Sequence, residues 1–336
     1  MDIQEQIKTF GELVAEATSV LLLQPDKPDG DSLSSMLALE AILSDLGKTV
    51  VMYCAGRIEP YLRHNPGWDR VHLADDFPTE AWDIAVLVDT PSPDQIARLL
   101  GPHHAELNRK PWIVVDHHDK RTPIVGVSLD INVPEAAAAS EVLYAIAKQL
   151  NWPLGSDTCA RLVAALYADT LNLTTSSVTV QTVQTFAELV ATGNLNVSEL
   201  HRVYREAAAT DPDLLLVKGK LLESLELHHD NQIALIVIPE ELVKAYRERT
   251  SLSSLVMFEI LWARGVKVAA VMSDYGSVVR TSLRARLPIA GIVAERLGGG
   301  GHPQAAAFSS TDTPLMELRS RLIAELATEL DAFASA

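Results

Sequence analysis

The chain has 336 residues, of which 48% are hydrophobic and 21% are charged, and its formal net charge is −16. Because this length exceeds the range in which one hydrophobic core usually keeps growing, we expect two domains with separate cores. The acidic balance excludes a protein that coats duplex nucleic acid through a broad basic face, so a phosphate-bearing ligand must be small or be met by a local basic patch or a metal.

The N-terminal sequence MDIQEQIKTF contains acidic residues and no apolar stretch of signal-peptide length. The apolar run at residues 20–23 is too short to span a bilayer, so we predict a cytoplasmic protein with no membrane partner. The two cysteines, Cys54 and Cys159, lie in separate segments without CxxC spacing. We interpret them as reduced core thiols, with a disulfide as the alternative.

Short apolar runs alternate with helical patterns through the first half of the chain. A helical pattern covers residues 32–47, and the apolar runs are residues 19–23, 49–54, 83–89 and 112–117. Runs of this length, bounded by Pro, Gly and Asp, are typical of buried strands in βα units. They predict an α/β domain with a mainly parallel sheet flanked by helices. Helical patterns then dominate from about Ala137 to Leu225.

A smaller α/β unit begins after these helices. Residues 232–239, 266–273 and 278–286 predict strands, and residues 240–249 predict a helix. We place the first domain at residues 1–205, a helical linker at 206–225 and the second domain at 226–336. A cleft is expected between the two domains.

Acidic side chains follow three of the apolar runs in the first domain, and a further acid closes the helical pattern RLVAALYADT. The residues are Asp29 and Asp31, Asp89, Asp116 with His117 and His118, and Asp169. Because ligands of open parallel sheets bind outside the carboxyl ends of the strands, we expect these groups to converge on one crevice.

Each acid also has a purely structural alternative. Asp29 or Asp31 suits the cap of the helix that begins near Ser32, Asp89 suits a turn, and Asp169 suits the end of its helix. As a set, however, crowded carboxylates repel one another unless they are protonated or bound to cations.

Oxygen-rich ligands with one imidazole suit Mn²⁺ or Mg²⁺ better than zinc. The acids and His117 therefore predict a centre of two metal ions. Such a centre can bind phosphoryl oxygen, lower the pKa of a water molecule and align the nucleophile with the leaving group.

A glycine-rich segment, LGGGGHPQAAAF, occupies residues 297–308 of the second domain. Consecutive glycines can turn their N–H groups inward as an anion-binding nest, although a flexible linker is the alternative. Three arginines, Arg280, Arg284 and Arg286, lie upstream and share one face if their segment is a regular strand. Together these features predict a place for phosphate or ribose.

Four motifs occur in the order PDGDS, a strand-ending DT, DHH and GGGGH. In this order they resemble the DHH phosphoesterase superfamily, in its subgroup with a C-terminal DHHA1 domain. The resemblance covers nearly the whole chain, and the size and layout are most similar to the compact oligoribonuclease (nanoRNase) and pAp phosphatase type. It implies a metal-dependent phosphohydrolase that cleaves short oligonucleotides, 3′-phosphoadenosine 5′-phosphate (pAp) or cyclic and linear dinucleotides.

The resemblance also implies the metal ligands. The expected ligands are Asp31, Asp89, His117 and Asp169 for one ion, and Asp29 with the shared Asp89 for the other. The first motif of this type usually reads H-x-N-P-D-G-D, and its histidine corresponds to Pro25 here. We therefore expect one firmly bound Mn²⁺ and a weaker second position, near which only Asp26 or Gln24 can substitute. Mg²⁺ is the alternative ion.

Other residues take their roles from the same resemblance. His118 would contact the scissile phosphate, and Asp116 would orient His117 and fix its tautomer. Ser140 is similar to a small hydroxyl residue of the family that precedes a helix. The substrate-binding candidates in the second domain are Arg280, Arg284, Gly299, Gly300, Gly301 and His302, of which Arg284 matches the family's substrate-binding arginine and the last three match its GGGH.

Two rival functions stay open. The sequence GDSL at residues 30–33 is also the nucleophile signature of serine esterases, with Ser32 as nucleophile, but that fold needs a late D-x-x-H and the only such spacing runs from Asp69 to His72. A nucleotide-binding regulatory protein that lost activity with its histidine ligand is the second rival. The sequence does not decide the physiological substrate, RNA or DNA preference, the direction of attack or the formation of a homodimer.

Overall fold

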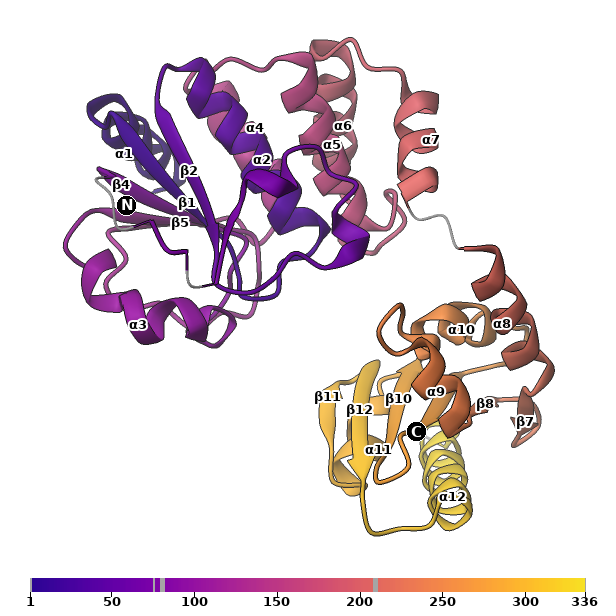
Figure 1. Ribbon diagram of the computed structural model, residues 1–336. Helices are drawn as coiled ribbons and strands as arrows, with labels where there is room; N and C mark the ends of the chain where they lie inside the picture. The colour runs from indigo at the N-terminus through magenta and orange to yellow at the C-terminus, as the bar shows by residue number, and fades with distance from the viewer. Residues whose placement is uncertain (1, 75, 79–81, 208–210, 336) are drawn as a thin grey trace. The chain divides into compact units, whose positions relative to one another are not determined.

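The computed structural model describes residues 2–74, 76–78, 82–207 and 211–335. The chain divides into two compact units, Met1–Ala209 and Thr210–Ala336, and each is an α/β domain with its own six-stranded sheet (Figure 1). The predicted fold class, with a mainly parallel sheet in the first domain and a smaller α/β second domain, is confirmed.

In the first unit every strand pair runs parallel, in the order β3-β2-β1-β4-β5-β6. The strands are β1 (Ser19–Leu23), β2 (Thr49–Cys54), β3 (His72–Leu73), β4 (Ile84–Val88), β5 (Trp112–Asp116) and β6 (Leu129–Asn132). All residues of β4 and β5 are buried, which is why these strands appear in the sequence as unbroken apolar runs. The short strands β3 and β6 carry too weak a pattern to have been predicted.

Helices cover both faces of this sheet. The helices and short 3-10 turns of the unit are α1 (Ile3–Glu16), α2 (Gly30–Asp45), η1 (Pro60–Leu62), η2 (Trp68–Arg70), η3 (Pro93–Ile96), α3 (Ala97–Leu107), α4 (Ala139–Gln149), α5 (Ser156–Thr170), α6 (Val180–Thr192) and α7 (Val197–Ala207). On one face α1, α2, α4 and α5 bury residues such as Phe10 and Leu33 against Leu22 of β1. The other face packs Leu99 of α3 against Trp112 of β5 (Figure 1).

The strand order reverses between β1 and β4. From β1 the chain proceeds to β2 and β3 on one side, whereas β4, β5 and β6 extend the sheet on the other side. In open α/β sheets the crevice outside the carboxyl ends of the strands at such a reversal is where ligands bind. The segments that follow β1, β4 and β5 meet at this point, and they carry the predicted site.

The second unit contains a mixed sheet in the order β11-β12-β10-β9-β8-β7, in which only β8 and β9 pair in parallel. Its elements are α8 (Pro212–Glu223), β7 (Glu226–His228), β8 (Ile233–Ile238), α9 (Glu240–Tyr246), α10 (Leu252–Leu261), β9 (Val268–Asp274), β10 (Val279–Ala285), α11 (Ala290–Arg296), β11 (Gly300–His302), β12 (Ala305–Ser310) and α12 (Leu315–Ala334). Helices α11 and α12 cover one face, and α8, α9 and α10 contribute to the core on the other.

The segment predicted as a linker, residues 206–225, includes the whole of α8. Val217 and Leu221 of this helix are buried in the same core cluster as Ala234 of β8 and Val256 of α10. Helix α8 therefore packs as part of the second unit. Within the described residues, each helix is either too short or too polar to cross a lipid bilayer.

The glycine-rich segment does not fold as the predicted nest. Gly300–His302 form the edge strand β11, in which Gly301 pairs with Ala306 of β12. A Cβ atom on Gly301 would lie 2.6 Å from the Ala305 carbonyl oxygen, and its φ of +143° also suits only glycine. Close pairing with β12 therefore explains this glycine, and that long-range contact leaves no local signature in the sequence.

Candidate active site

Asp89 follows β4 directly and has a left-handed backbone with φ of 56°. Non-glycine residues adopt this conformation rarely, although aspartate tolerates it better than most, and such residues cluster at functional sites. The residue is only 5% exposed, and its buried Oδ1 atom accepts no hydrogen bond from the described residues. The chain therefore places a carboxylate oxygen without a neutral hydrogen-bond donor inside the crevice.

Asp31 lies in the first turn of α2 and is held more completely. Its Oδ2 atom accepts a hydrogen bond from the Ala139 N–H at 2.6 Å, and its Oδ1 atom accepts from Ser35 Oγ at 2.8 Å and from the Ser140 N–H at 3.3 Å. Helices α2 and α4 thus fix this carboxylate from two sides. Ser140 contributes here through its backbone, while its hydroxyl is buried without a hydrogen-bond partner among the described residues.

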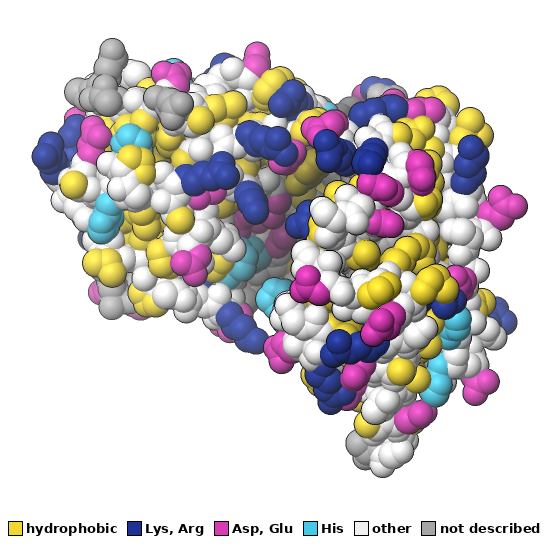
Figure 2. Space-filling view, turned by 60° about the horizontal axis from the view of Figure 1, so that its bottom comes forward, with side chains coloured by type: hydrophobic (Ala, Val, Ile, Leu, Met, Phe, Trp, Pro, Cys, Tyr) yellow, Lys and Arg dark blue, Asp and Glu magenta, His cyan; other side chains and the backbone are white. Residues whose placement is uncertain are grey.

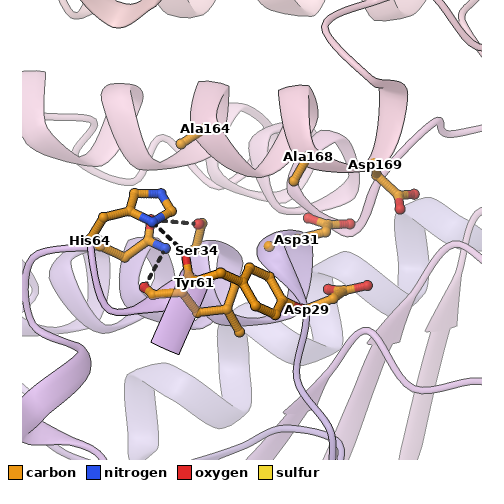
Figure 3. A pocket seen from close by; sticks show the side chains of 11 residues that line it. Asp29, Asp31, Ser34, Tyr61, His64, Ala164, Ala168 and Asp169 are labelled. Carbon is orange, nitrogen blue, oxygen red and sulfur yellow. Dashed lines mark hydrogen bonds between the residues drawn. The ribbon is translucent and has the colours of Figure 1, made fainter. Parts of the chain in front are cut away.

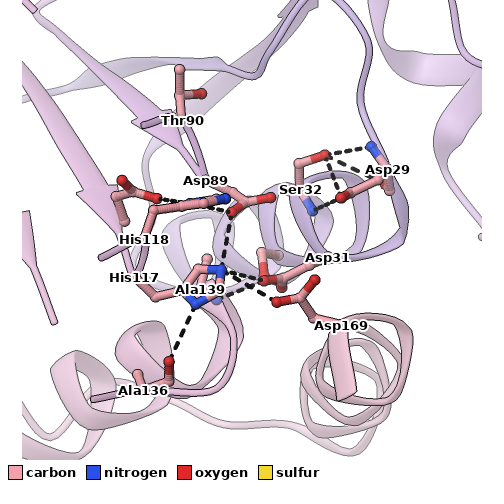
Figure 4. Close-up of polar contacts among 12 residues, drawn as sticks. Asp29, Asp31, Ser32, Asp89, Thr90, His117, His118, Ala136, Ala139 and Asp169 are labelled. Atoms are coloured by element: carbon pink, nitrogen blue, oxygen red, sulfur yellow. Dashed lines mark hydrogen bonds and ion pairs between the residues drawn. The ribbon is translucent and has the colours of Figure 1, made fainter. Parts of the chain in front are cut away.

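Three carboxylates converge on one imidazole nitrogen (Figure 4). His117 Nε2 lies 3.3 Å from Asp169 Oδ2, 3.5 Å from Asp89 Oδ1 and 3.9 Å from Asp31 Oδ2. These groups come from the end of β4, the end of β5, the start of α2 and the end of α5. The predicted convergence of Asp31, Asp89, His117 and Asp169 is therefore present in the structure.

The partner of Asp116 differs from the prediction that it would orient His117. Its Oδ1 atom instead accepts a hydrogen bond from His118 Nδ1 at 2.8 Å, whereas His117 Nδ1 lies 3.2 Å from the Ala136 carbonyl oxygen. Because successive side chains of an extended chain point to opposite sides, Asp116 and His118 share a side and His117 takes the other. The backbone carbonyl of Ala136 accordingly fixes Nδ1 of His117 as the donor.

Asp116 is fully buried and also neutralises Arg121. Its Oδ2 atom lies 2.8 Å from Arg121 Nε, in an ion pair whose atoms are out of line for a hydrogen bond. Arg121 reaches further to Asp130 with two hydrogen bonds of 3.0 and 2.8 Å. Arg121 follows DHH closely in the sequence, but neither the motif nor its spacing indicated this role.

Asp29 has the structural role considered as its alternative. It is the N-cap of α2, and its Oδ1 atom accepts a hydrogen bond from the Ser32 N–H at 3.0 Å. The Ser32 hydroxyl lies 3.1 Å from the same oxygen, and His72 is bonded to Asp76 at 2.6 Å. Because the Ser32 hydroxyl contacts Asp29 and the His72 imidazole contacts Asp76, the two do not form a nucleophile–base pair. The geometry therefore disfavours a serine esterase in which Ser32 is the nucleophile.

Burial and crowding disfavour negative charge on the converging carboxylates. Burial raises the pKa of Asp31 well above its ordinary value, and the charges of Asp89 and Asp169 raise it further. Burial likewise raises the pKa of Asp89, and raises that of Asp169 to about 6. Burial opposes a charge on His117, but Asp89, Asp31 and Asp169 outweigh it and raise the pKa of the imidazole to about 9. The site therefore retains protons in the absence of other positive charge.

The residues present fit a divalent cation. In each of two groups, Asp31 with His117 and Asp169, and Asp89 with His117 and His118, one ligand atom per residue lies within 4.8 Å of the others. The unbonded Asp89 oxygen and the oxygen-rich donor set suit a hard cation such as Mn²⁺ or Mg²⁺. Asp29 belongs to neither group.

Pro25 occupies the position that corresponds to the missing histidine, and it is buried after β1. Of its neighbours, Asp26 accepts a hydrogen bond from the Arg98 N–H at 2.8 Å, so that its carboxylate is directed toward α3. Gln24 is 1% exposed, and neither polar atom of its amide has a hydrogen-bond partner among the described residues. Gln24 is thus the neighbour of Pro25 whose two side-chain polar atoms are free to bind a ligand.

Helices α2 and α5 approach one another closely beside the carboxylates. A Cβ atom on Gly30 would lie 2.5 Å from the Cβ atom of Ala168. Gly30 separates Asp29 from Asp31, and Ala168 precedes Asp169. The contact therefore sets the separation of the acids on the two helices.

A hollow of about 330 Å³ adjoins the carboxylates in the first unit (Figure 3). It is lined by Asp29, Gly30, Asp31, Ser34, Tyr61, Leu62, His64, Asn65, Ala164, Ala168 and Asp169. Sequence analysis did not indicate Tyr61 or His64, because their segment after β2 is irregular and carries no motif. Only tertiary packing brings them to the site.

The predicted substrate-binding residues of the second unit lie on and around β10. Arg280 and Arg284 are exposed on the same face of this strand. Arg280 lines a hollow of about 470 Å³ together with Gly298 and Gly299, whereas Arg284 lines a separate hollow of about 290 Å³ beside Phe258 of α10. The two arginines therefore line different hollows.

The remaining candidates extend this surface. Arg286 lies beyond the end of β10 and its guanidinium stacks on the Trp262 ring at 4.9 Å. His302 is exposed at the end of β11. On the face drawn in Figure 2, basic and acidic side chains are interspersed.

Comparison with known families matches residues 19–173 to the DHH family, N-terminal domain. A bifunctional oligoribonuclease and PAP phosphatase, NrnA, from Bacillus subtilis is 22% identical over 87% of this chain and 89% of its own. NrnA from Thermus thermophilus is 23% identical over 90% of this chain and 87% of its own.

Two solved structures share the fold. An exopolyphosphatase-related protein from Bacteroides fragilis superposes with a TM-score of 0.83 and 18% identity, over 98% of each chain. RecJ from Thermus thermophilus, in complex with Mn²⁺, superposes with a TM-score of 0.54 and 15% identity, over 97% of this chain and 55% of its own.

Proposed function

Residues 19–173 match the DHH family, N-terminal domain, and on that premise we propose that the chain is a Mn²⁺-dependent phosphohydrolase of short nucleotides. The substrates are short oligoribonucleotides, pAp or dinucleotides, and the enzyme cleaves their phosphodiester or phosphomonoester bonds. Relatives named as oligoribonuclease and PAP phosphatase, and the Mn²⁺ complex of RecJ, support this choice. Mg²⁺ is the alternative ion.

One observation carries the proposal. Carboxylates from β4, α2 and α5 lie 3.5, 3.9 and 3.3 Å from the single nitrogen His117 Nε2. Buried acids with raised pKa values are costly to the fold unless they compensate a bound positive charge. Asp31, Asp89, His117 and Asp169 would hold the first cation, and Asp29 with Asp89 would hold the weaker second one. When bound, the cations supply positive charge to phosphoryl oxygens and acidify water.

His118 would bind the scissile phosphate. Its Nδ1 atom donates to Asp116, which leaves Nε2 as the ring nitrogen that can donate to a phosphoryl oxygen. The hydrogen bond with Asp116 raises the pKa of His118 and so favours the cationic form. Asp116 would hold the ring in place. Although burial raises the pKa of Asp116, the hydrogen bond and charge of His118, and then the charge of Arg121, outweigh it and lower the pKa, so that Asp116 stays ionised. This pair would stabilise charge that builds on the phosphate during the reaction.

The second unit would bind the remainder of the substrate. Arg280 and Arg284 provide exposed guanidinium groups, and a guanidinium recognises phosphate through paired donors. Gly300, Gly301 and His302 form the edge strand β11, whose outer side is open to a ligand, and Gly299 precedes it with its N–H bonded to the Ala294 carbonyl oxygen. The second unit would thus add substrate contacts to the one that His118 makes in the first unit.

A substrate panel tests the proposal. The full chain is incubated with pAp, short oligoribonucleotides of several lengths, a linear dinucleotide and a cyclic dinucleotide, each with Mn²⁺, Mg²⁺ or chelator, and product lengths are resolved. We expect release of phosphate or mononucleotide with Mn²⁺ and none with chelator.

Pro25 and the helix-capping role of Asp29 favour one alternative, a nucleotide-binding regulatory protein. That function would be indicated by measurable nucleotide binding with no product under any metal. Turnover that is unaffected by chelator would exclude the metal-dependent mechanism.

A further inference from the structure

The hollow beside the metal-ligand candidates has two chemically different ends (Figure 3). Asp29, Asp31 and Asp169 form one end, which suits a phosphate only when cations are present. His64 lies at the other end, and Tyr61 lies between His64 and Asp29. A ligand that spans the hollow therefore needs an anionic group at one side and an uncharged planar or polar group at the other.

Tyr61 is presented by an anchored segment although its own side chain is 61% exposed. The flanking Leu62 is buried, and the side chain of Asn65 donates a hydrogen bond of 2.9 Å to its carbonyl oxygen. Ser34 of α2 donates to Asn65 Oδ1 at 3.1 Å, and the Arg63 guanidinium lies 4.9 Å from the centre of the Trp68 ring. These contacts order the backbone that follows Tyr61, so that an exposed ring is held at low entropic cost.

His64 adds a polar group at the same end. Its Nδ1 atom lies 2.7 Å from the Tyr61 carbonyl oxygen, which makes Nδ1 the donor and leaves Nε2 to contact a ligand. The opposite wall consists of Ala164 and Ala168, whose small side chains one turn apart on α5 leave the space open. Aromatic, imidazole and methyl groups together suit a planar ring with polar edges.

We infer that the Tyr61 end of this hollow binds the nucleobase of the nucleotide whose phosphate lies at the carboxylate end. The inference rests on the proposed function and adds to it a subsite of the first unit. The base stacks on the Tyr61 ring, and His64 contacts its edge. Because every base has a π-face, stacking of this kind accepts all bases and favours the larger purines.

The test compares substrates that differ only in the base. Hydrolysis of pAp is measured against hydrolysis of the abasic deoxyribose 3′,5′-bisphosphate, for the full chain and for Tyr61→Ala, Tyr61→Trp and Ala164→Leu. Loss of one stacked base should raise the KM for pAp roughly tenfold in Tyr61→Ala. Tyr61→Trp should retain binding, and Ala164→Leu should raise the KM by filling the space. The abasic substrate should be hydrolysed equally by all four proteins.

A second measurement does not depend on catalysis. Binding of adenosine alone, without phosphate or added metal, is followed by saturation-transfer difference NMR. Adenosine should bind the unmodified chain and Ala145→Leu, a matched change on the exposed face of α4, but not Tyr61→Ala or Ala164→Leu.

The outcomes separate the two proposals. Adenosine binding that requires Tyr61, with no hydrolysis of any substrate, would reject the phosphohydrolase and keep the base subsite. Hydrolysis of pAp with the same KM in Tyr61→Ala would overturn the subsite and keep the enzyme. An equal loss on pAp and on the abasic substrate would also overturn it, because it would show that Tyr61 supports the segment rather than the base.

Discussion

His117 Nε2 and Asp169 Oδ2 lie 3.3 Å apart, although one residue follows a central strand and the other ends a helix. The contact exists because α5 packs on α2 over the carboxyl edge of the sheet, where Gly30 meets Ala168. Helix packing therefore completes the proposed ligand set, to which the strands alone would not contribute Asp169. The following predictions depend on this arrangement.

Replacing Asp89 with Asn should lower kcat by at least about 100-fold, because the proposed cations lose the carboxylate that they share. Asparagine is the preferred substitution, since it tolerates the left-handed backbone at φ of 56° better than alanine does. Removing one of several repelling acids should leave the melting temperature of the metal-free protein unchanged or higher. Steady-state kinetics and calorimetry check this, with Asp45→Asn, an exposed acid of α2, as the control. Full activity in Asp89→Asn would contradict the shared role.

Binding of Mn²⁺ at pH 7 should release at least about one proton, because a cation needs the neutral imidazole of His117. The pKa of His117 is raised to about 9 from 6.5, so the ring is protonated in the metal-free protein at this pH. Calorimetric titration in two buffers of different ionisation enthalpy measures the release. The release should change in His117→Ala and stay the same in His72→Ala, and a buffer-independent enthalpy would contradict the prediction.

The same raised pKa values make the stability of the metal-free protein depend on pH. A group whose pKa is raised in the folded state contributes to the free energy of unfolding. This stabilisation is fully present below the pKa of the unfolded state and is lost as pH rises through the pKa of the folded state. For Asp169 this window runs from 3.8 to about 6, and for His117 from 6.5 to about 9. The stabilisation that Mn²⁺ confers should therefore grow from pH 6 to pH 9. Melting temperatures with Mn²⁺ and with chelator across this range test the prediction, and a constant difference would count against it.

Replacing Asp116 with Asn should destabilise the fold by about 3 kcal/mol, because it leaves Arg121, whose side chain is only 16% exposed, without its buried partner. Asp130→Asn is the matched control, since it removes the other partner of the same arginine. The side chain of Asp130 is 43% exposed. That exposed pair should contribute less than about 1 kcal/mol. Urea denaturation of the metal-free proteins measures both, and equal losses would show that burial of Asp116 is not the cause.

Replacing Pro25 with His should tighten the second Mn²⁺ by about tenfold, equivalent to about 1.4 kcal/mol. The substitution supplies the imidazole that the family motif carries at this position. The number and affinity of bound Mn²⁺ ions are measured by calorimetric titration, with Pro25→Ala as the control for loss of the proline ring. An unchanged second affinity would show that another group, such as the unbonded amide of Gln24, already occupies that role.

Replacing Arg284 with Ala should raise the KM for pAp about tenfold with little change in kcat, because it removes substrate binding and leaves the proposed metal centre intact. Arg264→Ala, which alters an exposed arginine of the same unit, is the control. Kinetics with pAp and Mn²⁺ measure both variants. A fall in kcat at constant KM would place Arg284 in the chemical step instead.

Much of the first unit could be predicted, because its central strands are buried on both faces and appear as continuous apolar runs. The ends of β4 and β5 place Asp89 and Asp116 at the sheet edge, and the reversal of strand order brings them to one crevice. The position of Asp169 was harder to predict, since it depends on how helix α5 packs against α2 and not on where a strand ends.

The errors have specific physical causes. The pairing of Asp116 with His118 follows from the alternation of side chains along an extended chain, so the sequence contained that signal and motif-based reasoning overlooked it. The edge strand at Gly300–His302 depends on pairing with β12, and the position of Tyr61 depends on an irregular segment anchored to α2. Such long-range contacts have no local pattern.

The close approach of Gly30 and Ala168 also fixes how near α2 and α5 lie to one another beside the carboxylates. A methyl group at position 30 would force the two helices apart and lengthen the reach from Asp31 to Asp169. Calcium is larger than manganese or magnesium and tolerates irregular coordination at longer distances. If Asp31 and Asp169 hold the proposed cation, an alanine at residue 30 should therefore shift the preference of the site toward calcium without altering any ligand.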